Sequence, residues 1–477
     1  MTLTIFGVLT IVISLWLMFR GTALQQFTFV ILSSLLGGSS AINLPALGGS
    51  SIRPFLLAFL MLFARLVVTR VGGASAILRA VRKNVLLVCF CAYGVIGALI
   101  LPRVFAGQVD LVPMRPITLQ YAVVTQLPLA FSSQNITAAF YLSGTLLGVV
   151  VGDILARRPG AHRVVVNTFL LTSWAHMGLG VLGLALKLLH HEELLSFFRN
   201  ASYAQLDNEY RGWIRITGVM PEASVYAGYG FMMLVITTEF WLRDLRTKLS
   251  GFTSLAMALI LLLSTSSSAY VGMAGYAVVL LLRWMIFPAG LGTRKAVVLL
   301  ACSMGAVIAF LGLAVAMPRI MVQLQDMLHH MTLDKANSQS AYERGIWARQ
   351  GLDAFMTSLG LGVGPGSFRS SSSLLAIVGS MGVIGIITYL GYLLQVLKPW
   401  RESTFRPVSN EVQAVGVALS WTLIAGPIPA LVNAASPDPG QNFAIMAAMT
   451  LVWRGVASRA PHRSPAPVAR AAPEVMT

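Results

Sequence analysis

Four arginines near the starts of apolar segments are the residues of this chain best suited to bind an anion. Arg211 and Arg215 lie in the segment RGWIRITGVMPEAS, just before the apolar run VYAGYGFMMLVITTEFW, while Arg344 and Arg369 lie in or after a long polar stretch. A guanidinium group is always charged, and its planar fork binds phosphate through two parallel hydrogen bonds. The four arginines therefore indicate a phosphate or diphosphate ligand.

The first pair of arginines precedes a predicted helix. If residues 211–215 are helical, Arg211 and Arg215 share one face, because residues four apart are neighbours on a helix. Gly218 then ends that helix, and Pro221 suits the first turn of the next one, where its missing N–H costs nothing. The free N–H groups at that helix start carry a partial positive charge. The sequence thus predicts an anion site where Arg215 meets a helix N-terminus.

A second helix start of the same kind follows the segment GLGVGPGSFRSSSS. This loop leads to Arg369 and a serine run, Ser370 to Ser373, in which one serine can cap the next helix and free N–H groups can face an anion. Ser371 and Ser372 are therefore candidate substrate-binding residues, together with Arg369 and Arg211. The glycine pattern alone fits an ordinary loop, but two arginine-flanked helix starts favour an oxyanion site over structural ion pairs.

Few residues are suited to act as a general base. Glu222 lies at the first helix start, and Glu343 precedes Arg344 in the segment SAYERGIWARQGL. Both carboxylates have structural alternatives, for Glu222 a helix cap with an ion pair to Arg215. His176 lies inside an apolar run and is expected to be a core residue. The histidines outside the apolar runs are His190, His191, His329 and His330.

The composition places these candidate residues in a membrane protein. The 477 residues are 56% hydrophobic and only 11% charged. Apolar runs, each close to the roughly 20 residues that a helix needs to cross hydrocarbon, lie near residues 3–19, 22–37, 53–69, 84–102, 136–153, 164–187, 222–242, 251–266, 268–287, 294–316, 373–396, 411–433 and 440–454. We therefore expect an all-α polytopic fold of about 12–13 transmembrane helices. These helices form one membrane domain, residues 1–454.

The net charge of +17 is best explained by membrane topology. Most Lys and Arg residues lie in alternate loops, which the positive-inside rule places in the cytoplasm. The complementary loops then lie on the external side and carry the candidate arginines. They include residues 188–221 and the long loop 317–372, which lies between the tenth and eleventh helices. Residues 455–477, rich in Pro, Ala and Arg, are expected to form a disordered cytoplasmic tail. Nucleic acid is not expected as a partner.

Several other features narrow the chemistry. The sequence has no Asp-x-Asp, so a carboxylate-held divalent metal on a nucleotide sugar is not expected. Residues 264–270, STSSSAY, predict a tight external turn that binds sugar hydroxyls or serves helix packing. Arg65, inside an apolar run, is expected to face the bundle or to reach the cytoplasmic edge. The cysteines also fall in apolar runs and are expected to be core residues, Cys89, Cys91 and Cys302.

Taken in order, these motifs resemble the O-antigen ligase and polymerase superfamily of bacterial envelope glycosyltransferases. The segment RITGVMPEAS leads into one predicted helix, and STSSSAYVGM begins another. The segment SAYERGIWARQGL lies in the long external loop, and GLGVGPGSF with GSMGVIG follows at the end of that loop. All of these motifs lie within residues 205–396. The resemblance implies an enzyme of the bacterial inner membrane with its active site facing the periplasm. Such an enzyme transfers glycan from undecaprenyl diphosphate to an acceptor hydroxyl, inverts the anomeric carbon, and uses no metal or other cofactor.

The resemblance also assigns roles to residues. Arg215 and Arg344 match the diphosphate-binding arginines, which would stabilise charge on the departing diphosphate. Ligases usually carry a histidine where this chain has Ser371 and Ser372, so a repeat-unit polymerase for O-antigen or exopolysaccharide is the better assignment than a ligase acting on lipid A–core. Glu222 joins the two arginines as a candidate catalytic residue. Glu343 and the histidines His329 and His330 remain alternatives as the base.

The implied partners are the undecaprenyl-diphosphate-linked glycan donor, a glycan acceptor, membrane lipids, and further proteins such as a chain-length regulator and a flippase. A non-enzymatic transporter of lipid-linked oligosaccharides is an alternative from another class. A transporter would more naturally show inverted repeats and charges along a midplane pathway. In this chain the candidate charges gather on one side, which favours chemistry at the membrane surface.

Overall fold

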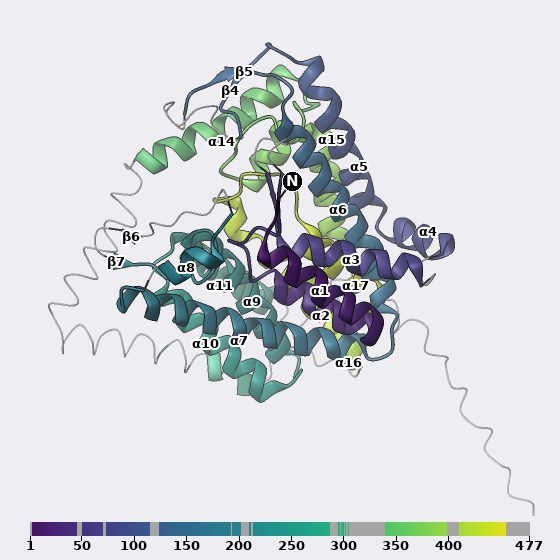
Figure 1. Cartoon of the computed structure of the whole chain (residues 1–477), viewed down its shortest axis with the longest axis vertical. Coiled ribbons are helices and arrows are strands. Elements are labelled where there is room, and N and C mark those ends of the chain that lie inside the picture. Colours follow the sequence, from purple (N-terminus) through teal and green to yellow (C-terminus); the bar gives the residue numbers. More distant parts are fainter. Residues whose placement is uncertain are drawn as a thin grey trace, which may run out of the picture.

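The structure is a computed structural model. It describes residues 2–44, 50–69, 73–114, 124–191, 193–201, 209–210, 213–286, 294–295, 297–299, 301, 304, 339–397 and 410–454. Helices dominate these residues (Figure 1). Their bounds are α1 Ile5–Arg20, α2 Ala23–Ser33, α3 Pro54–Val68, α4 Ala74–Lys83, α5 Val85–Val104, α6 Ser133–Ala156, α7 Ala161–Leu188, α8 Glu193–Phe198, α9 Ala223–Leu242, α10 Thr247–Leu263, α11 Ser267–Ile286, α14 Gln339–Thr357, α15 Ser373–Leu397, α16 Glu411–Ala425, η3 Ile428–Leu431 and α17 Gln441–Arg454.

Extended structure is confined to short antiparallel pairings in the part of the chain described. The strands β1 (Thr2–Leu3), β2 (Ile42–Leu44) and β3 (Ser50–Ile52) form one sheet in that order. The strand β4 (Asp110–Leu111) pairs with β5 (Leu127–Pro128), above α14 at the top of Figure 1. The third pair is β6 (Glu209–Tyr210) with β7 (Trp213–Ile214). These pairs join helix ends and add little to the core.

The length and composition of the helices confirm an all-α membrane protein. Among the described residues, 7 segments are long and apolar enough to cross a membrane, namely α5, α6, α7, α9, α11, α15 and Glu411–Leu431. Shorter apolar helices, α1, α2, α3 and α10, accompany them. The expected run near 294–316 lies mostly outside the described residues, as do residues 317–338 of the long loop and the tail 455–477.

Polar side chains set the ends of the amino-terminal helices. The Thr22 hydroxyl accepts a hydrogen bond from the Gln25 backbone, and the Gln25 side chain accepts one from the Thr22 backbone, which forms a capping box at the start of α2. Arg65 of α3 faces the bundle. Its guanidinium donates to the carbonyl oxygens of Leu17 (2.8 Å) and Gly21 (2.7 Å), where α1 ends. A charge in an apolar helix is thus satisfied by carbonyl groups at the carboxyl end of α1.

The helices α6 and α17 approach each other closely through small residues. Gly144, Gly148 and Gly152 lie at intervals of four on α6 and face α17. A Cβ atom added at Gly148 would lie 3.1 Å from the Ala444 Cβ. Small residues at this spacing let helix backbones pack tightly in a membrane, where hydrophobic burial does not drive association. The contact fixes the start of α17 against α6.

The loop between α14 and α15 wraps around a kink in α15. Gly382 has a φ of 57° and a ψ of −150°, a conformation that only glycine adopts without strain. The Gly360 carbonyl accepts a hydrogen bond from the backbone N–H of Val383 (2.9 Å), and the N–H groups of Val363 and Gly364 donate to α15 carbonyls at 2.9 Å. This backbone pairing holds α14 against the first half of α15.

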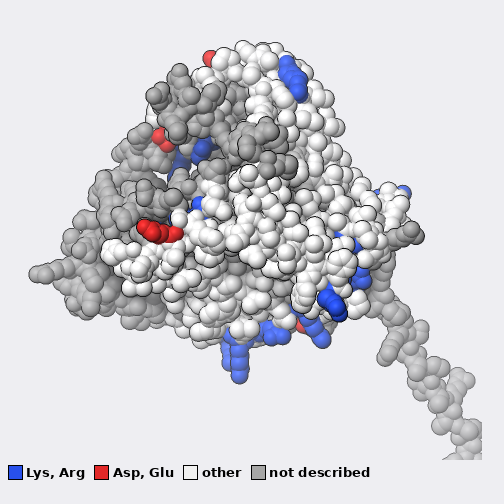
Figure 2. All heavy atoms as spheres, viewed as in Figure 1, with Lys and Arg blue, Asp and Glu red and all other residues white. Residues whose placement is uncertain are grey.

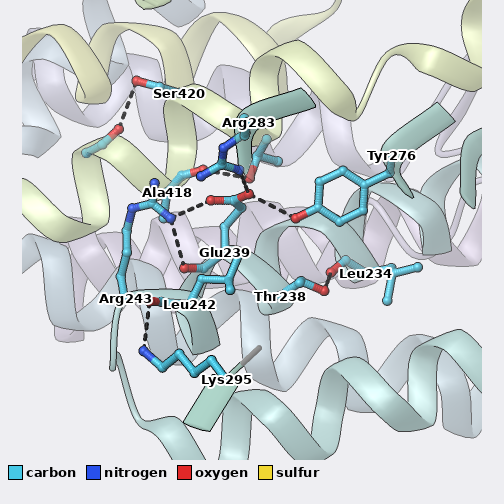
Figure 3. Close-up of polar contacts among 12 residues, drawn as sticks. Leu234, Thr238, Glu239, Leu242, Arg243, Tyr276, Arg283, Lys295, Ala418 and Ser420 are labelled. Carbon is cyan, nitrogen blue, oxygen red and sulfur yellow. Dashed lines mark hydrogen bonds and ion pairs between the residues drawn. The ribbon is translucent and has the colours of Figure 1, made fainter. Parts of the chain in front are cut away.

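A buried ionic cluster joins α9 to α11 (Figure 3). The Glu239 carboxylate accepts hydrogen bonds from Arg243 (2.5 Å), Arg283 (2.5 Å) and the Tyr276 hydroxyl (2.9 Å). The Arg283 guanidinium also lies 3.8 Å from the centre of the Trp421 ring in α16. All these charged groups are buried, so the carboxylate and the arginines depend on one another for compensation.

Charged residues are unevenly spread over the face shown in Figure 2. Lys and Arg side chains lie mainly along the lower and right-hand edges, and most of the remaining described surface in this view carries no charge. Exposed large hydrophobic residues occur along the described helices, including Leu99 and Ile100 of α5 and Ile387 of α15. Such apolar helix faces, bordered by charge, fit a protein surrounded by lipid.

The Glu239 cluster generates a stability prediction. Replacing Glu239 with Gln leaves two buried guanidinium groups without their counter-charge, and we expect a loss of about 3–5 kcal/mol in unfolding free energy. Asp244 provides the control because its side chain is 50% exposed and pairs with Lys295 at 2.8 Å. Asp244→Asn should cost at most about 1 kcal/mol. Denaturation of the purified protein in detergent measures both values; similar midpoints for the two variants would contradict this assignment.

The α15 kink generates a second prediction. In Gly382→Ala the new methyl group would collide with the Gly360 carbonyl, and the backbone strain alone costs about 1–3 kcal/mol. At Gly178 in α7, an added methyl group meets nothing within 4 Å. Gly178→Ala should therefore be neutral or stabilising by up to about 1 kcal/mol. Thermal unfolding in detergent compares the two variants, and an unchanged midpoint for Gly382→Ala would show that the kink is dispensable.

Candidate functional site

Arg369 lies at the centre of a group of charged residues from three helices. Its guanidinium carbon is 4.3 Å from the centre of the buried Trp347 ring of α14. The Gln350 side chain donates to the Arg369 carbonyl and accepts a hydrogen bond from the Val112 backbone at 2.7 Å. The Arg369 N–H donates to the Val112 carbonyl at 3.0 Å. The backbone of Arg369 is therefore clamped between α14 and the segment after β4.

Two carboxylates act on this arginine. Burial lowers the pKa of Arg369, and the negative charges of Glu222 and Glu343 partly restore it. Since Glu222 precedes α9, Glu343 belongs to α14 and Arg369 precedes α15, the starts of α9 and α15 meet beside α14. We call Arg344, Arg369, Glu222 and Glu343 the arginine site.

The serines connect the start of α15 to α14. The Ser371 hydroxyl donates to the Arg344 carbonyl at 2.8 Å. The Ser370 hydroxyl donates to the Ser372 carbonyl at 3.0 Å and accepts from the Ser372 N–H at 3.2 Å. The structure thus brings Arg344, Ser371 and Ser372 together with Arg369. In this arrangement the described serine contacts are to backbone groups.

The start of α9 leaves backbone donors without a side-chain cap. Glu222 is the N-cap residue, but its side chain does not cap the helix and instead accepts a hydrogen bond from the Ser224 hydroxyl. Pro221 lies before the N-cap rather than in the first turn, a small correction to the expected position. A helix start with free N–H groups favours an anion. Among the described residues, the buried Arg369 Nε also has no hydrogen-bond partner.

The segment around Arg215 differs from the sequence prediction. The strand β6 pairs antiparallel with β7, so Trp213 and Ile214 form a strand instead of part of the helix expected over residues 211–215. Aromatic and β-branched residues at 210, 213 and 214 favour strands, which explains the difference. Arg211 lies outside the described residues. The Arg215 carbonyl accepts a hydrogen bond from Lys187 of α7 at 3.3 Å, and its charge acts on Tyr270 at the start of α11.

A cavity of about 800 Å³ lies beside the arginine site. Pro221 and Ser224 from the start of α9, and Ser373 from the start of α15, contribute to its wall. The segment between α16 and α17 also lines the cavity. Apolar side chains cover much of the interior, among them Phe55, Val225, Met232, Ile377 and Met446. The cavity therefore combines an apolar volume with two helix starts and their polar groups.

The other predicted residues take structural or separate positions. His176 is buried, and its ring stacks on Tyr226 with centroids 4.0 Å apart, as expected for a core residue. His190 and His191 are exposed after α7, whereas His329 and His330 are not part of the described chain. The turn expected over residues 264–270 covers only residues 264–266, because α11 begins at Ser267. Asn433 donates a hydrogen bond to Ser268 of α11 at 3.3 Å.

The sequence reasoning missed two charged residues that line the cavity. Asp438 and Arg53 both line it, although neither follows a motif used above. The available signal was the segment SPDPG, residues 436–440, in which a carboxylate lies between two prolines just before an apolar run. Among the described residues, no group of three or more His, Cys, Asp or Glu side chains is arranged to hold a metal ion.

The fold and the site define an all-α membrane protein with arginines at two helix starts beside a cavity. No protein-family model matches the chain, and no curated protein matches it. The functional assignment therefore depends on the motifs of the sequence and on the geometry of the site.

Anion binding at the arginine site is directly testable with inorganic pyrophosphate. At 100 times its dissociation constant, pyrophosphate should stabilise the purified wild-type protein by about 2.7 kcal/mol in thermal unfolding. Arg369→Gln should lose most of this shift because it removes the buried charge that faces the ligand. Arg349→Gln, at an exposed position of α14, should retain it. An equal shift in the two variants would place pyrophosphate elsewhere.

Proposed function

We propose that the protein is an inner-membrane polymerase that joins lipid-linked repeat units of O-antigen or exopolysaccharide. It takes the glycan from undecaprenyl diphosphate and transfers it to a hydroxyl group of the next unit. The observation that carries this proposal is the buried Arg369 Nε, which has no hydrogen-bond partner among the described residues and lies beside the α9 and α15 starts. A diphosphate satisfies that donor and the free N–H groups of α9 together.

The arginines supply the electrostatic part of the reaction. When the bond between the anomeric carbon and the diphosphate breaks, negative charge grows on the departing phosphate oxygen. Arg369 and Arg344, which are both partly buried, stabilise this charge, and such an interaction is stronger in a partly buried site than in water. Arg215 approaches from the α7 and α11 side. Direct attack by the acceptor hydroxyl inverts the anomeric carbon.

The cavity supports a substrate that is part lipid and part sugar. Its volume of about 800 Å³ is in the range of cavities that enclose a ligand of several rings. The apolar lining suits the first isoprene units of a carrier lipid. Ser224, Asn433 and Gln441 also line the cavity and offer hydrogen-bonding groups for sugar hydroxyls.

The positions of basic residues support a periplasmic active site. Arg79 and Arg157 pair with Asp153 near the end of α6, and Arg163 pairs with Glu411 near the start of α16. These groups lie at the ends of helices opposite to the ends that border the arginine site. By the positive-inside rule the basic ends face the cytoplasm. The arginine site then faces the periplasm of a bacterial inner membrane.

Position 371 supports polymerase over ligase. The Ser371 hydroxyl donates to the Arg344 carbonyl, so the place where ligases usually carry a histidine holds a residue committed to joining α14 and α15. A serine hydroxyl is also a poor proton acceptor at neutral pH. The alternative functions are glycan transfer to lipid A–core by a ligase and transport without reaction. Glycan profiles distinguish both of them from polymerisation.

Glycan profiles of cells lacking this gene test the proposal. Complementation with Arg344→Lys or Arg215→Lys should leave single repeat units and lower polymer yield at least about 100-fold, because a point charge does not replace the bidentate fork. Arg349→Lys is the matched control and should restore wild-type chains. Long chains that remain on undecaprenyl diphosphate would indicate a ligase. Repeat units that remain on the cytoplasmic side would indicate a transporter. Normal polymer from both variants would refute the role of these arginines.

A further inference from the structure

Among the described residues that line the cavity, Asp438 is the one carboxylate. It lies in the segment between η3 and α17. The cavity wall includes both Asp438 and the site-bordering residues Ser224 and Ser373. A molecule in the cavity that contacts Asp438 and these two serines would lie next to the helix starts that carry the arginine site.

The carboxylate of Asp438 is held in one orientation. Its Oδ1 atom accepts hydrogen bonds from the Thr145 hydroxyl of α6 (2.7 Å) and from the Gly440 N–H (3.0 Å). Thr145 follows Gly144, which packs against Gln441 at the start of α17. The Oδ2 atom takes no hydrogen bond from the described part of the chain. One oxygen is thus fixed and the other is open to a ligand.

The surroundings make this carboxylate a stronger base than an exposed aspartate. Burial raises the pKa of Asp438, and the hydrogen bonds from Thr145 and Gly440 and the charge of Arg53 oppose this rise without cancelling it. The negative charge of Asp438 also acts on Tyr389 of α15 and Cys91 of α5. A carboxyl group with a raised pKa accepts a proton more readily from a hydroxyl group during reaction.

The other candidate bases are placed differently. Glu222 accepts a hydrogen bond from Ser224, and Glu222 and Glu343 both act electrostatically on Arg369. A carboxylate beside the leaving diphosphate balances the arginine charge, whereas a base has to approach the sugar from the side opposite to the leaving group. Neither glutamate lines the cavity. His190 and His191 are exposed after α7 and do not line it either.

We propose that Asp438 is the catalytic residue that accepts the proton of the acceptor hydroxyl, an assignment that rests on the proposed polymerase function. The acceptor oxygen forms a bond to the anomeric carbon as its proton moves to Asp438 Oδ2. The bond from that carbon to the diphosphate oxygen breaks, and the electron pair leaves with the diphosphate. Asp438 then passes the proton to water. Thr145 is a positioning residue because it orients the carboxylate through Oδ1.

The test uses purified full-length protein in lipid vesicles with lipid-linked repeat units extracted from the deletion strain. Asp438→Asn keeps the shape of the side chain and should lower the polymerisation rate at least about 100-fold. The exposed Asp110 of β4 provides the control, and Asp110→Asn should match the wild type. Thermal stabilisation by inorganic pyrophosphate should be equal in all three proteins, because Asp438 does not hold the diphosphate.

The pH dependence separates a base from a structural carboxylate. A carboxylate must be deprotonated to act, so the wild-type rate should fall as pH drops through the raised pKa of Asp438, above the usual range of an aspartate. The residual rate of Asp438→Asn should lack this fall.

Each outcome bears on the assignment. A wild-type rate in Asp438→Asn would overturn the role of this residue, and if Arg344→Lys were still inactive, the polymerase proposal would stand. Loss of both rate and pyrophosphate stabilisation in Asp438→Asn would show that the residue is structural and would also overturn the assignment. Full rates in Asp438→Asn and Arg344→Lys would contradict both proposals.

Discussion

The backbone contact between the loop after α14 and the kink of α15 determines where the charged residues lie. Gly382 lets the Gly360 carbonyl pair with the Val383 N–H, so α14 packs along the first half of α15. Trp347 and Arg344 of α14 are thereby carried to the start of α15, where Arg369 lies. A membrane interior tolerates such irregular backbone only where protein groups satisfy it. The loop meets this condition through α15 carbonyls.

Buried or partly buried charges occur in two regions, which differ in how directly the opposite charges are paired. In the Glu239 cluster, a carboxylate binds two guanidinium groups and a hydroxyl directly, and all are buried away from the cavity. In the arginine site, the acids act on Arg369 at longer range, and its buried Nε keeps an unused donor among the described residues. Direct pairing favours stability, whereas incomplete pairing beside a cavity favours a ligand.

The sequence predicted features whose causes are local. Apolar runs predicted most of the described helices but not α4, α8 or α14. Pro221 with Glu222 marked the start of α9 because helix starts have strong residue preferences. The contact between Arg344 and Ser371 could not be predicted from the sequence, because it depends on the path of the loop after α14 rather than on the spacing of the two residues in the chain. Asp438 was missed for the same reason. Its importance comes from α6, which supplies Thr145 from a distant part of the chain.

The structure of the protein bound to undecaprenyl diphosphate, determined by electron cryomicroscopy, would test the central claim most directly. We expect the diphosphate to contact Arg369 and the N-terminal N–H groups of α9, with the lipid chain leaving along the apolar wall of the cavity. A diphosphate bound away from the arginine site, with Arg369 unchanged and the cavity empty, would contradict the proposed role of these residues.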